Sequence, residues 1–245
     1  MEKRPGPLSW LMKRLHGPVY ASRLAELVRR ITPHLRENDQ VLDVGCGYGS
    51  LGRAIMDSPA CPKGVSVRGL ERVKRGGEAI EVDAYDGVTI PHPDRSFDVV
   101  MLADVLHHEA DPHRLIGECV RVSRRLLIIK DHAVQGPFAQ QRISLLDWAA
   151  NAPYGVPCLY RYNSPAEWDQ WKQRHALQTD EELRSMRLYP LPYSLFFTPG
   201  LQYMGVFRVP AAGATMGTWP SSSASERASS TSGGSAPSNT PATAG

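Results

Sequence analysis

The chain has 245 residues, of which 42% are hydrophobic and 22% are charged, and its formal net charge is +3. These values fit a globular protein with a packed core, and they exclude a strongly basic nucleic-acid-binding chain and an acidic disordered one. The four cysteines form no C-x-x-C pair and lie near no histidine at zinc-finger spacing, so the sequence predicts neither a disulfide framework nor a structural zinc.

The positive charge gathers at the start of the chain, where residues 1–36 carry eight Lys or Arg and two Glu. Apolar residues recur at helical spacing on both sides of Gly17-Pro18, which predicts two short amphipathic helices ending at Thr32-Pro33. We expect this helical arm to act as a lid, with Tyr20 close to a bound ligand. A peripheral membrane contact through residues 8–15 is the alternative.

From Gln40 onward, short apolar strands alternate with helical segments, which predicts βαβ units and a parallel sheet with helices on both faces. The expected strands are 40–44, 65–71, 79–83, 97–102, 126–130, 186–189 and 202–209. One helix is expected after Asp111-Pro112, and another at the capping box that begins with Ser164.

We expect one domain over residues 37–210 and a disordered tail over 211–245, because the tail consists largely of Ser, Thr, Ala, Gly and Pro. No apolar run approaches the roughly 20 residues of a membrane span, and the first apolar stretch is too short for a signal-peptide core. The sequence therefore favours a cytoplasmic protein.

The stretch from Val41 to Gly49 reads Val-Leu-Asp-Val-Gly-Cys-Gly-Tyr-Gly. A buried strand that runs into a glycine turn and then a helix lets the backbone approach a nucleotide-like ligand. Gly47, Gly49 and Gly52 also fit the dinucleotide pattern, so a nicotinamide-dependent oxidoreductase is an alternative. The carboxylate of Asp43 suits a ligand with an ammonium and a sulfonium group better than a pyrophosphate.

This stretch resembles the first motif of the class I S-adenosylmethionine-dependent methyltransferases, and in particular their small-molecule, type 11-like branch. The resemblance covers about residues 40–132. Glu71 matches the acidic residue that closes the family's second strand, and residues 82–85 match its adenine-contacting segment. Residues 90–108 resemble the stretch around the fourth strand.

The resemblance implies an α/β fold, a Rossmann-like three-layer sandwich whose mostly parallel seven-stranded sheet has its last strand antiparallel. It also implies that the chain binds S-adenosyl-L-methionine and releases S-adenosyl-L-homocysteine. Only about seven residues separate Glu71 from the third strand, so the usual helix there must be reduced to a turn or lost. The cofactor-binding candidates are Asp43, Gly45, Cys46, Gly47, Gly49, Glu71, Asp83, Ala84, Tyr85, Ala103, Asp104 and Tyr20.

Ligands of open α/β sheets lie beyond the carboxyl ends of the strands, so the acceptor-side candidates follow the fourth and fifth strands. They are Asp104, His107, His108, Lys130, Asp131 and His132. His132 is the preferred general base, because a neutral imidazole can take a proton near pH 7. Asp131 is expected to orient His132 or to bind a cationic acceptor. We expect no metal, since the histidines of residues 107–113 lack a dependable ligand spacing and methyl transfer needs none.

Together these features predict an S-adenosylmethionine-dependent methyltransferase that acts on a small-molecule acceptor, apolar or lipid-like, at oxygen, nitrogen or carbon. We expect no nucleic-acid partner. The alternatives are the oxidoreductase, a non-catalytic S-adenosylmethionine-binding module, and an RNA methyltransferase that uses the basic arm as its electrostatic contact.

Overall fold

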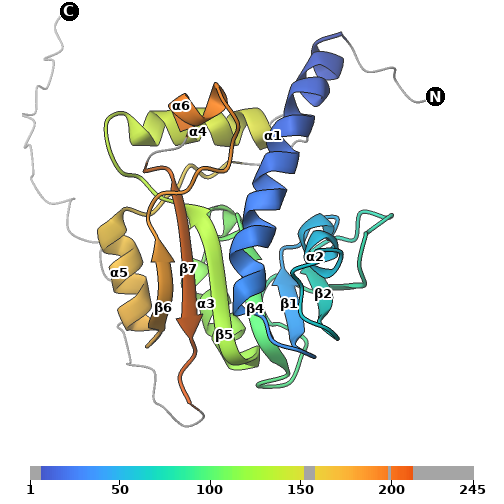
Figure 1. Cartoon of the computed structure of the whole chain (residues 1–245). Helices are drawn as coiled ribbons and strands as arrows, with labels where there is room; N and C mark the ends of the chain where they lie inside the picture. Colours follow the sequence, from blue (N-terminus) through green and yellow to red (C-terminus); the bar gives the residue numbers. More distant parts are fainter. Residues whose placement is uncertain (1–6, 152–157, 198–199, 212–245) are drawn as a thin grey trace, which may run out of the picture.

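The computed structural model describes residues 7–151, 158–197 and 200–211 of the chain. Its seven strands form one sheet in the order β3-β2-β1-β4-β5-β7-β6. Figure 1 shows the six strands from β2 to β6 of this order side by side. The strands are β1 (Gln40–Val44), β2 (Ser66–Glu71), β3 (Val82–Ala84), β4 (Phe97–Ala103), β5 (Ser123–His132), β6 (Gln178–Leu183) and β7 (Gln202–Arg208). The helices are α1 (Pro7–Ile31), α2 (Ser50–Met56), α3 (Pro112–Val122), α4 (Ala139–Asn151), α5 (Pro165–Arg174) and α6 (Tyr193–Phe197), with short 3-10 turns at Thr32–His34 and Leu106–His108.

The first five strands pair in parallel, and β7 runs antiparallel to both β5 and β6. This arrangement confirms the predicted fold class, including the antiparallel last strand. Because the carboxyl ends of β1 to β5 meet at one edge of the sheet, the segments that follow these strands lie together. That edge is where an open α/β sheet binds its ligands.

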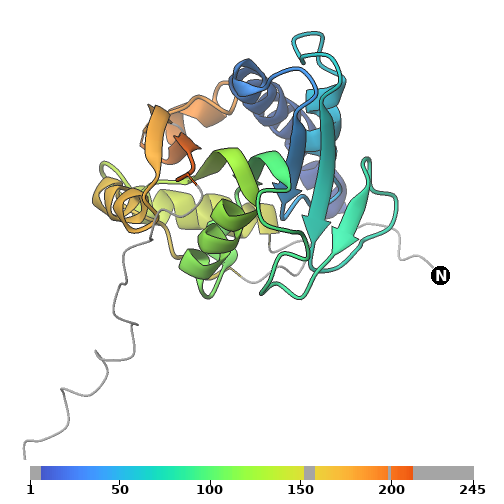
Figure 2. The ribbon, with the colours of Figure 1, turned by 90° about the horizontal axis from the view of Figure 1, so that it is seen from below.

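Alternate residues of each central strand enter two separate cores. Leu42 and Val44 of β1 pack with Leu115 of α3 and Trp168 of α5, whereas Val41 packs on the other face with residues of α1 and α2. Figure 2 shows α1 and α2 on one side of the sheet and α3 on the other. The near-continuous burial of β1, β4 and β5 reflects a sheet that is covered on both faces.

The N-terminal arm is one helix, so the prediction of two short helices was wrong. The helix α1 continues through Gly17-Pro18, although a proline normally pushes the preceding residue out of the helical region by a clash with its Cβ. Gly17 has no Cβ, which removes one part of this clash, although Pro18 still lacks the N–H that would donate to the preceding turn. The predicted end of the arm is confirmed, because α1 stops at Ile31 and a 3-10 turn with Pro33 follows.

The strand predicted at residues 186–189 is also wrong, and β6 at Gln178–Leu183 takes its place beside β7. The sequence of β6, Gln-Thr-Asp-Glu-Glu-Leu, carries little apolar signal because β6 is an edge strand with a largely solvated surface. Met186 and Leu188 are nevertheless buried, at 2% and 0% exposure, in the core under α1. The apolar residues of this buried connecting segment therefore gave a sequence pattern like that of a strand.

Several local predictions are confirmed. Asp111 caps α3 by accepting the N–H of Arg114 at 3.1 Å, and Ser164 forms a capping box with Glu167 at the start of α5. The segment from Arg72 to Glu81 contains no helix. The tail predicted to be disordered lies, beyond residue 211, outside the described residues. None of the described helices has the length and hydropathy needed to cross a bilayer.

Candidate active site

A glycine turn joins β1 to α2 at the ligand-binding edge of the sheet. Gly45, Gly47 and Gly49 have φ angles of 71°, 59° and 71°, a region that residues with a side chain rarely adopt. A Cβ atom at Gly45 would lie 2.6 Å from a methyl carbon of Val105, whereas one at Gly47 would meet nothing within 4 Å. The turn is therefore packed on one side against the segment after β4 and open at Gly47.

Glu71 ties the end of β2 to this turn. Its Oε2 atom accepts the N–H of Gly47 at 2.8 Å, and its Oε1 atom accepts the N–H of Arg72 at 2.9 Å. The backbone N–H of Gly45 donates to the carbonyl of Leu70 at 2.8 Å, which fixes the start of the turn against β2. The structure thus brings together two groups of cofactor-binding candidates, the glycines and Glu71.

Asp43 is a buried carboxyl group at the base of the turn, with 2% of its surface exposed. Its Oδ2 atom has no hydrogen-bond partner among the described residues. Burial raises the pKa of Asp43 to about 7, while the charge of Arg23 opposes the shift and that of Glu71 adds to it. An unmatched buried acceptor of this kind fits a ligand that brings an N–H donor or a positive charge.

The other cofactor-binding candidates are less directly placed. Asp83 pairs with Arg68 at 2.7 Å, so its carboxylate is engaged on the sheet. The Cys46 sulfur lies against Gly69, which leaves its backbone for the turn. Ala84 is exposed, Tyr85 is half-buried against the core, and Ala103 packs against the other core. Tyr20 on α1 is 49% exposed.

Asp104 follows β4 in a left-handed conformation, with φ of 61°, and joins α1 to the sheet. Arg23 of α1 donates to its Oδ2 atom from Nε at 3.1 Å and from Nη2 at 2.6 Å, and the ammonium of Lys130 pairs with its Oδ1 atom. Burial raises the pKa of Asp104, but Lys130 and then Arg23 outweigh this and hold it well below the usual range. The buried cation of Lys130 and the partly buried one of Arg23 therefore share this carboxylate.

Asp131 braces the segment between β4 and α3. Its Oδ2 atom accepts the N–H of Leu106 at 2.9 Å, and its Oδ1 atom contacts Nδ1 of His107 at 2.7 Å and accepts the backbone N–H of His132 at 2.7 Å. These bonds hold the main chain of His132 and not its imidazole ring. Asp131 thus positions the 3-10 turn after β4.

The imidazole of His132 is buried, and its Nδ1 atom has no partner in the part of the chain that the structure describes. Burial lowers the pKa of His132 to about 3, although the carboxylate of Asp104, 3.8 Å from Nε2, opposes the shift. His132 is therefore a neutral ring near pH 7 with one unpaired nitrogen. The ring is thus able to accept a proton, although its low pKa makes it a weaker base than a histidine whose pKa lies near 7.

His107 lies between two carboxylates. Its Nδ1 atom contacts Asp131, and its Nε2 atom lies 3.7 Å from Oδ1 of Asp147 on α4. The hydroxyl of Tyr162 donates to Oδ2 of Asp147 at 2.6 Å. Burial lowers the pKa of His107, but the carboxylates, Asp131 first, raise it to about 10. Sequence reasoning placed His107 at this edge and did not identify Asp147 as its partner.

Two overlapping groups of residues bring three ligand atoms within 4.8 Å of one another. One comprises His107, Asp131 and His132, and the other comprises His107, His108 and Asp147. Both groups are largely buried and contain imidazole nitrogens with carboxylate oxygens, which are the donors that transition metals prefer.

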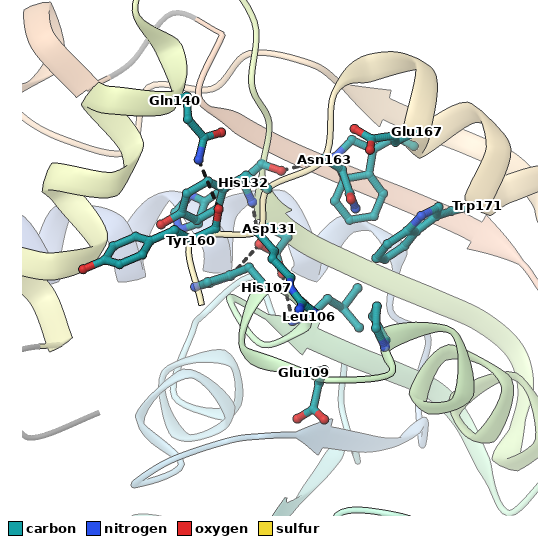
Figure 3. Close-up of a pocket in the computed structure, with 14 residues that line it drawn as sticks. Leu106, His107, Glu109, Asp131, His132, Gln140, Tyr160, Asn163, Glu167 and Trp171 are labelled. Carbon is teal, nitrogen blue, oxygen red and sulfur yellow. Dashed lines mark hydrogen bonds and ion pairs between the residues drawn. The ribbon is translucent and has the colours of Figure 1, made fainter. Parts of the chain in front are cut away.

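A cavity of about 360 Å³ adjoins this cluster. Figure 3 shows His107, Asp131 and His132 on one side of it and Trp171 of α5 on another. Its wall is rich in aromatic and polar side chains, namely those of Trp168, Trp171, Tyr160, Tyr162, Gln140, Asn163 and Glu109. The indole N–H of Trp168 donates to the carbonyl of His132 at 3.2 Å, which fixes that wall to β5.

The glycine turn and the cavity share one short segment. Val105 packs on Gly45 of the turn, and the next two residues, Leu106 and His107, line the cavity. A ligand in the turn and a second ligand in the cavity would therefore flank the same few residues after β4.

A family model described as a methyltransferase domain matches residues 19–181 of the chain. The 27-O-demethylrifamycin SV methyltransferase of Amycolatopsis mediterranei is 31% identical over 112 residues, which are 42% of this chain and 41% of that protein. The uncharacterized methyltransferase YcgJ of Bacillus subtilis is 23% identical over 62% of this chain and 71% of its own length. The chain thus spans about two fifths of the rifamycin enzyme.

Solved structures share the fold. The crystal structure of YcgJ from Bacillus subtilis superposes with a TM-score of 0.52 at 18% identity, covering 78% of this chain and 99% of that one. A SAM-dependent methyltransferase from Aquifex aeolicus superposes with a TM-score of 0.52 at 16% identity, covering 84% of this chain and 100% of that one. At these identities the likeness establishes the architecture.

Proposed function

Because this chain belongs to the methyltransferase domain family and is an S-adenosylmethionine-dependent methyltransferase, we propose that it methylates a hydroxyl group of a small organic molecule bound in the cavity. The observation that carries the proposal is the segment of Val105, Leu106 and His107, which joins the glycine turn to the cavity. Because the chain belongs to this family, we assign Gly47, Gly49 and Gly52 to a turn that binds S-adenosylmethionine and not to one that binds a nicotinamide cofactor.

The residues of the glycine turn fit the methyl donor, S-adenosylmethionine, which is called the donor below. Gly47 borders open space, Glu71 presents a carboxylate at the end of β2, and Asp43 keeps a buried oxygen without a partner among the described residues. We expect Glu71 to accept hydrogen bonds from the ribose hydroxyls, and Asp43 to face the cationic end of the donor. When bound, S-adenosylmethionine supplies a methyl group that its sulfonium charge makes electrophilic.

The cavity fits an acceptor with a planar apolar body and polar substituents. Trp171 and Tyr160 offer ring surface, while Gln140 and Asn163 offer hydrogen-bonding groups. The names of the matched relatives specify methylation of 27-O-demethylrifamycin SV, N-methylation of norajmaline and O-methylation in ubiquinone biosynthesis. These names support an organic acceptor over a nucleic acid.

A hydroxyl acceptor must lose its proton, and His132 is the residue best placed to take it. Its Nδ1 atom is unpaired among the described residues, and the carboxylate of Asp104, 3.8 Å from Nε2, stabilises the charge that the ring gains. The low pKa of His132 keeps the ring unprotonated in the physiological range and also makes it a weak base, so proton transfer to it depends on the nearby carboxylate of Asp104.

Calorimetric titration with S-adenosylmethionine tests the donor site. We expect the Glu71→Ala variant to bind the donor at least about tenfold more weakly, since hydrogen bonds to a charged group contribute about 1.5–3 kcal/mol. Glu37→Ala, a substitution of an exposed acidic residue before β1, is the matched control and should bind like the wild type. Equal affinities in all three proteins would contradict the assigned donor site.

Mass spectrometry of hydroxylated small molecules incubated with enzyme and donor tests the acceptor. Trp171→Ala should raise the KM for the acceptor and leave the KM for the donor unchanged, because Trp171 lines only the cavity side of the shared segment. Transfer of the methyl group to RNA, with no transfer to small molecules, would overturn the proposed acceptor while leaving the family assignment intact.

A further inference from the structure

Three side chains beside the cavity converge as metal ligands do. One ligand atom from each of His107, His108 and Asp147 lies within 4.8 Å of the other two. The Nε2 atom of His107 and the Oδ1 atom of Asp147 are 3.7 Å apart, which is too long for a hydrogen bond. Two metal–ligand bonds of about 2.1 Å, at angles of about 110–120°, would span about 3.4–3.7 Å between the ligand atoms.

The groups behind these ligands have the arrangement that supports a metal site. A histidine that binds a metal usually gives its other ring nitrogen to a carboxylate, and a ligating carboxylate is itself hydrogen-bonded. Asp131 contacts Nδ1 of His107 at 2.7 Å, so Nε2 is the nitrogen that faces Asp147. The hydroxyl of Tyr162 holds Oδ2 of Asp147 at 2.6 Å, so Oδ1 is the oxygen that faces His107.

His108 adds a third donor. Its ring packs against that of His107 with centroids 4.0 Å apart, and its Nδ1 atom is buried without a hydrogen-bond partner in the described part of the protein. Buried polar atoms of native proteins nearly always have a partner in the protein, a water or an ion, so this unmatched imidazole nitrogen is available to an ion. The group of His107, Asp131 and His132 is a weaker candidate, because Asp131 already uses the oxygen nearest His107 for a hydrogen bond.

We propose that His107, His108 and Asp147 bind one divalent transition-metal ion next to the acceptor cavity, which His107 lines, with Asp131 and Tyr162 orienting two of the ligands. Two imidazole nitrogens and one carboxylate oxygen favour Zn²⁺, Co²⁺ or Fe²⁺ over Mg²⁺ and Ca²⁺, which prefer oxygen ligands. This differs from the expectation of no metal, because the third ligand comes from α4 and the spacing of residues 107–113 could not show it.

Three protein ligands leave a coordination position for the oxygen of the acceptor. The ion would lower the pKa of the bound hydroxyl, whose proton passes to His132. The oxygen then forms the bond to the methyl carbon, and the electron pair of the broken carbon–sulfur bond stays on sulfur. This role rests on the proposed function, whereas binding of the ion does not.

Metal loading of the full-length, untagged protein tests the site. The protein is stripped with a chelator, reloaded with Co²⁺ and desalted, and its visible absorption and metal content are measured. We expect one Co²⁺ per chain with the absorption bands of a site that contains nitrogen ligands. Asp147→Asn and His108→Gln should each weaken Co²⁺ binding at least about tenfold, and Tyr162→Phe should weaken it about 10- to 100-fold, as loss of an orienting group does. His34→Gln, which changes a histidine remote from this cluster, should bind Co²⁺ like the wild type.

Failure of the wild type to retain Co²⁺ or Zn²⁺ would overturn the proposal, as would equal retention by the Asp147→Asn, His108→Gln and wild-type proteins. Circular dichroism and donor titration of each variant confirm that it is folded. If the stripped protein binds S-adenosylmethionine and methylates an acceptor but retains no metal, the metal site fails and the proposed function stands. If the metal binds at these residues and no small molecule is methylated, the proposed function fails and the metal site stands.

Discussion

The donor side and the acceptor side of the site are built by different means. Around the glycine turn, the described contacts are mostly between main-chain atoms. The chief side-chain contact is the hydrogen bond that the N–H of Gly47 donates to the carboxylate of Glu71. Around the cavity, buried and partly buried ionisable side chains from α1, β5, α4 and the segment after β4 hold one another in place. The donor side therefore depends on backbone shape, whereas the acceptor side depends on matched charge. We therefore expect substitutions on the donor side to reduce mainly ligand affinity, and substitutions on the acceptor side to reduce mainly the stability of the fold.

The largest effect is expected where the two sides meet, at Asp104. The Asp104→Ala substitution leaves the buried Lys130 and the partly buried Arg23 without the carboxylate that they share. Removing one partner from a buried ion pair costs about 3–5 kcal/mol, so urea unfolding should show a loss of that size. Asp57→Ala, which breaks the exposed pair with Arg53, is the control and should leave the free energy of unfolding nearly unchanged. If Asp104→Ala lowered the free energy of unfolding as little as the control does, pairing of opposite charges would not be what stabilises the acceptor side.

The second effect separates binding from stability on the donor side. In Gly47→Val, the new side chain enters the open side of the turn, so we expect donor affinity to fall at least about 100-fold, or about 2.7 kcal/mol. The left-handed backbone at Gly47 should cost about 1–2 kcal/mol of stability. Gly117→Ala in α3, where the added Cβ also meets nothing within 4 Å, is the control for both measurements. Donor affinity within a fewfold of the wild type would contradict the assignment of the open side to the donor.

The same difference explains what the sequence could predict. The donor side is formed by residues that lie close together in the sequence, namely a strand, a glycine turn and one acidic residue at the end of the next strand. All of these were predicted at their positions. The acceptor side was only partly predictable. His107 and His132 were placed by the rule that ligands lie beyond strand ends, but Asp147 and Tyr162 reach them from segments that no local pattern connects.

Two features of the fold were mispredicted for related reasons. The helix α1 passes through Gly17-Pro18, and its buried face packs on a sheet that comes later in the chain. The edge strand β6 has almost no apolar residues, and its place is set by pairing with β7. Tertiary contacts decided both cases, and these are not visible in a window of adjacent residues.

The smallest effect concerns the pH dependence of the charge on the acceptor side, measured on metal-free protein. The pKa of His107 is raised to about 10 in the folded protein, against about 6.5 in the unfolded chain. Protonation therefore stabilises the fold: this contribution is fully present below about pH 6.5 and is lost as the pH rises through about 10. The difference in free energy of unfolding between the wild type and His107→Gln should be about 2 kcal/mol near pH 6 and should shrink towards pH 10.

His175→Gln is the matched control for this measurement, because burial lowers the pKa of His175 to about 4 and the fold holds this ring neutral. Relative to His175→Gln, the wild type should lose stability as the pH falls below about 6.5, which is the opposite trend. Gly47→Val, on the donor side, should follow the wild-type pH profile with a constant offset. If His107→Gln and His175→Gln instead gave parallel profiles, His107 would not carry a charge between Asp131 and Asp147, and the acceptor side would be held by packing alone.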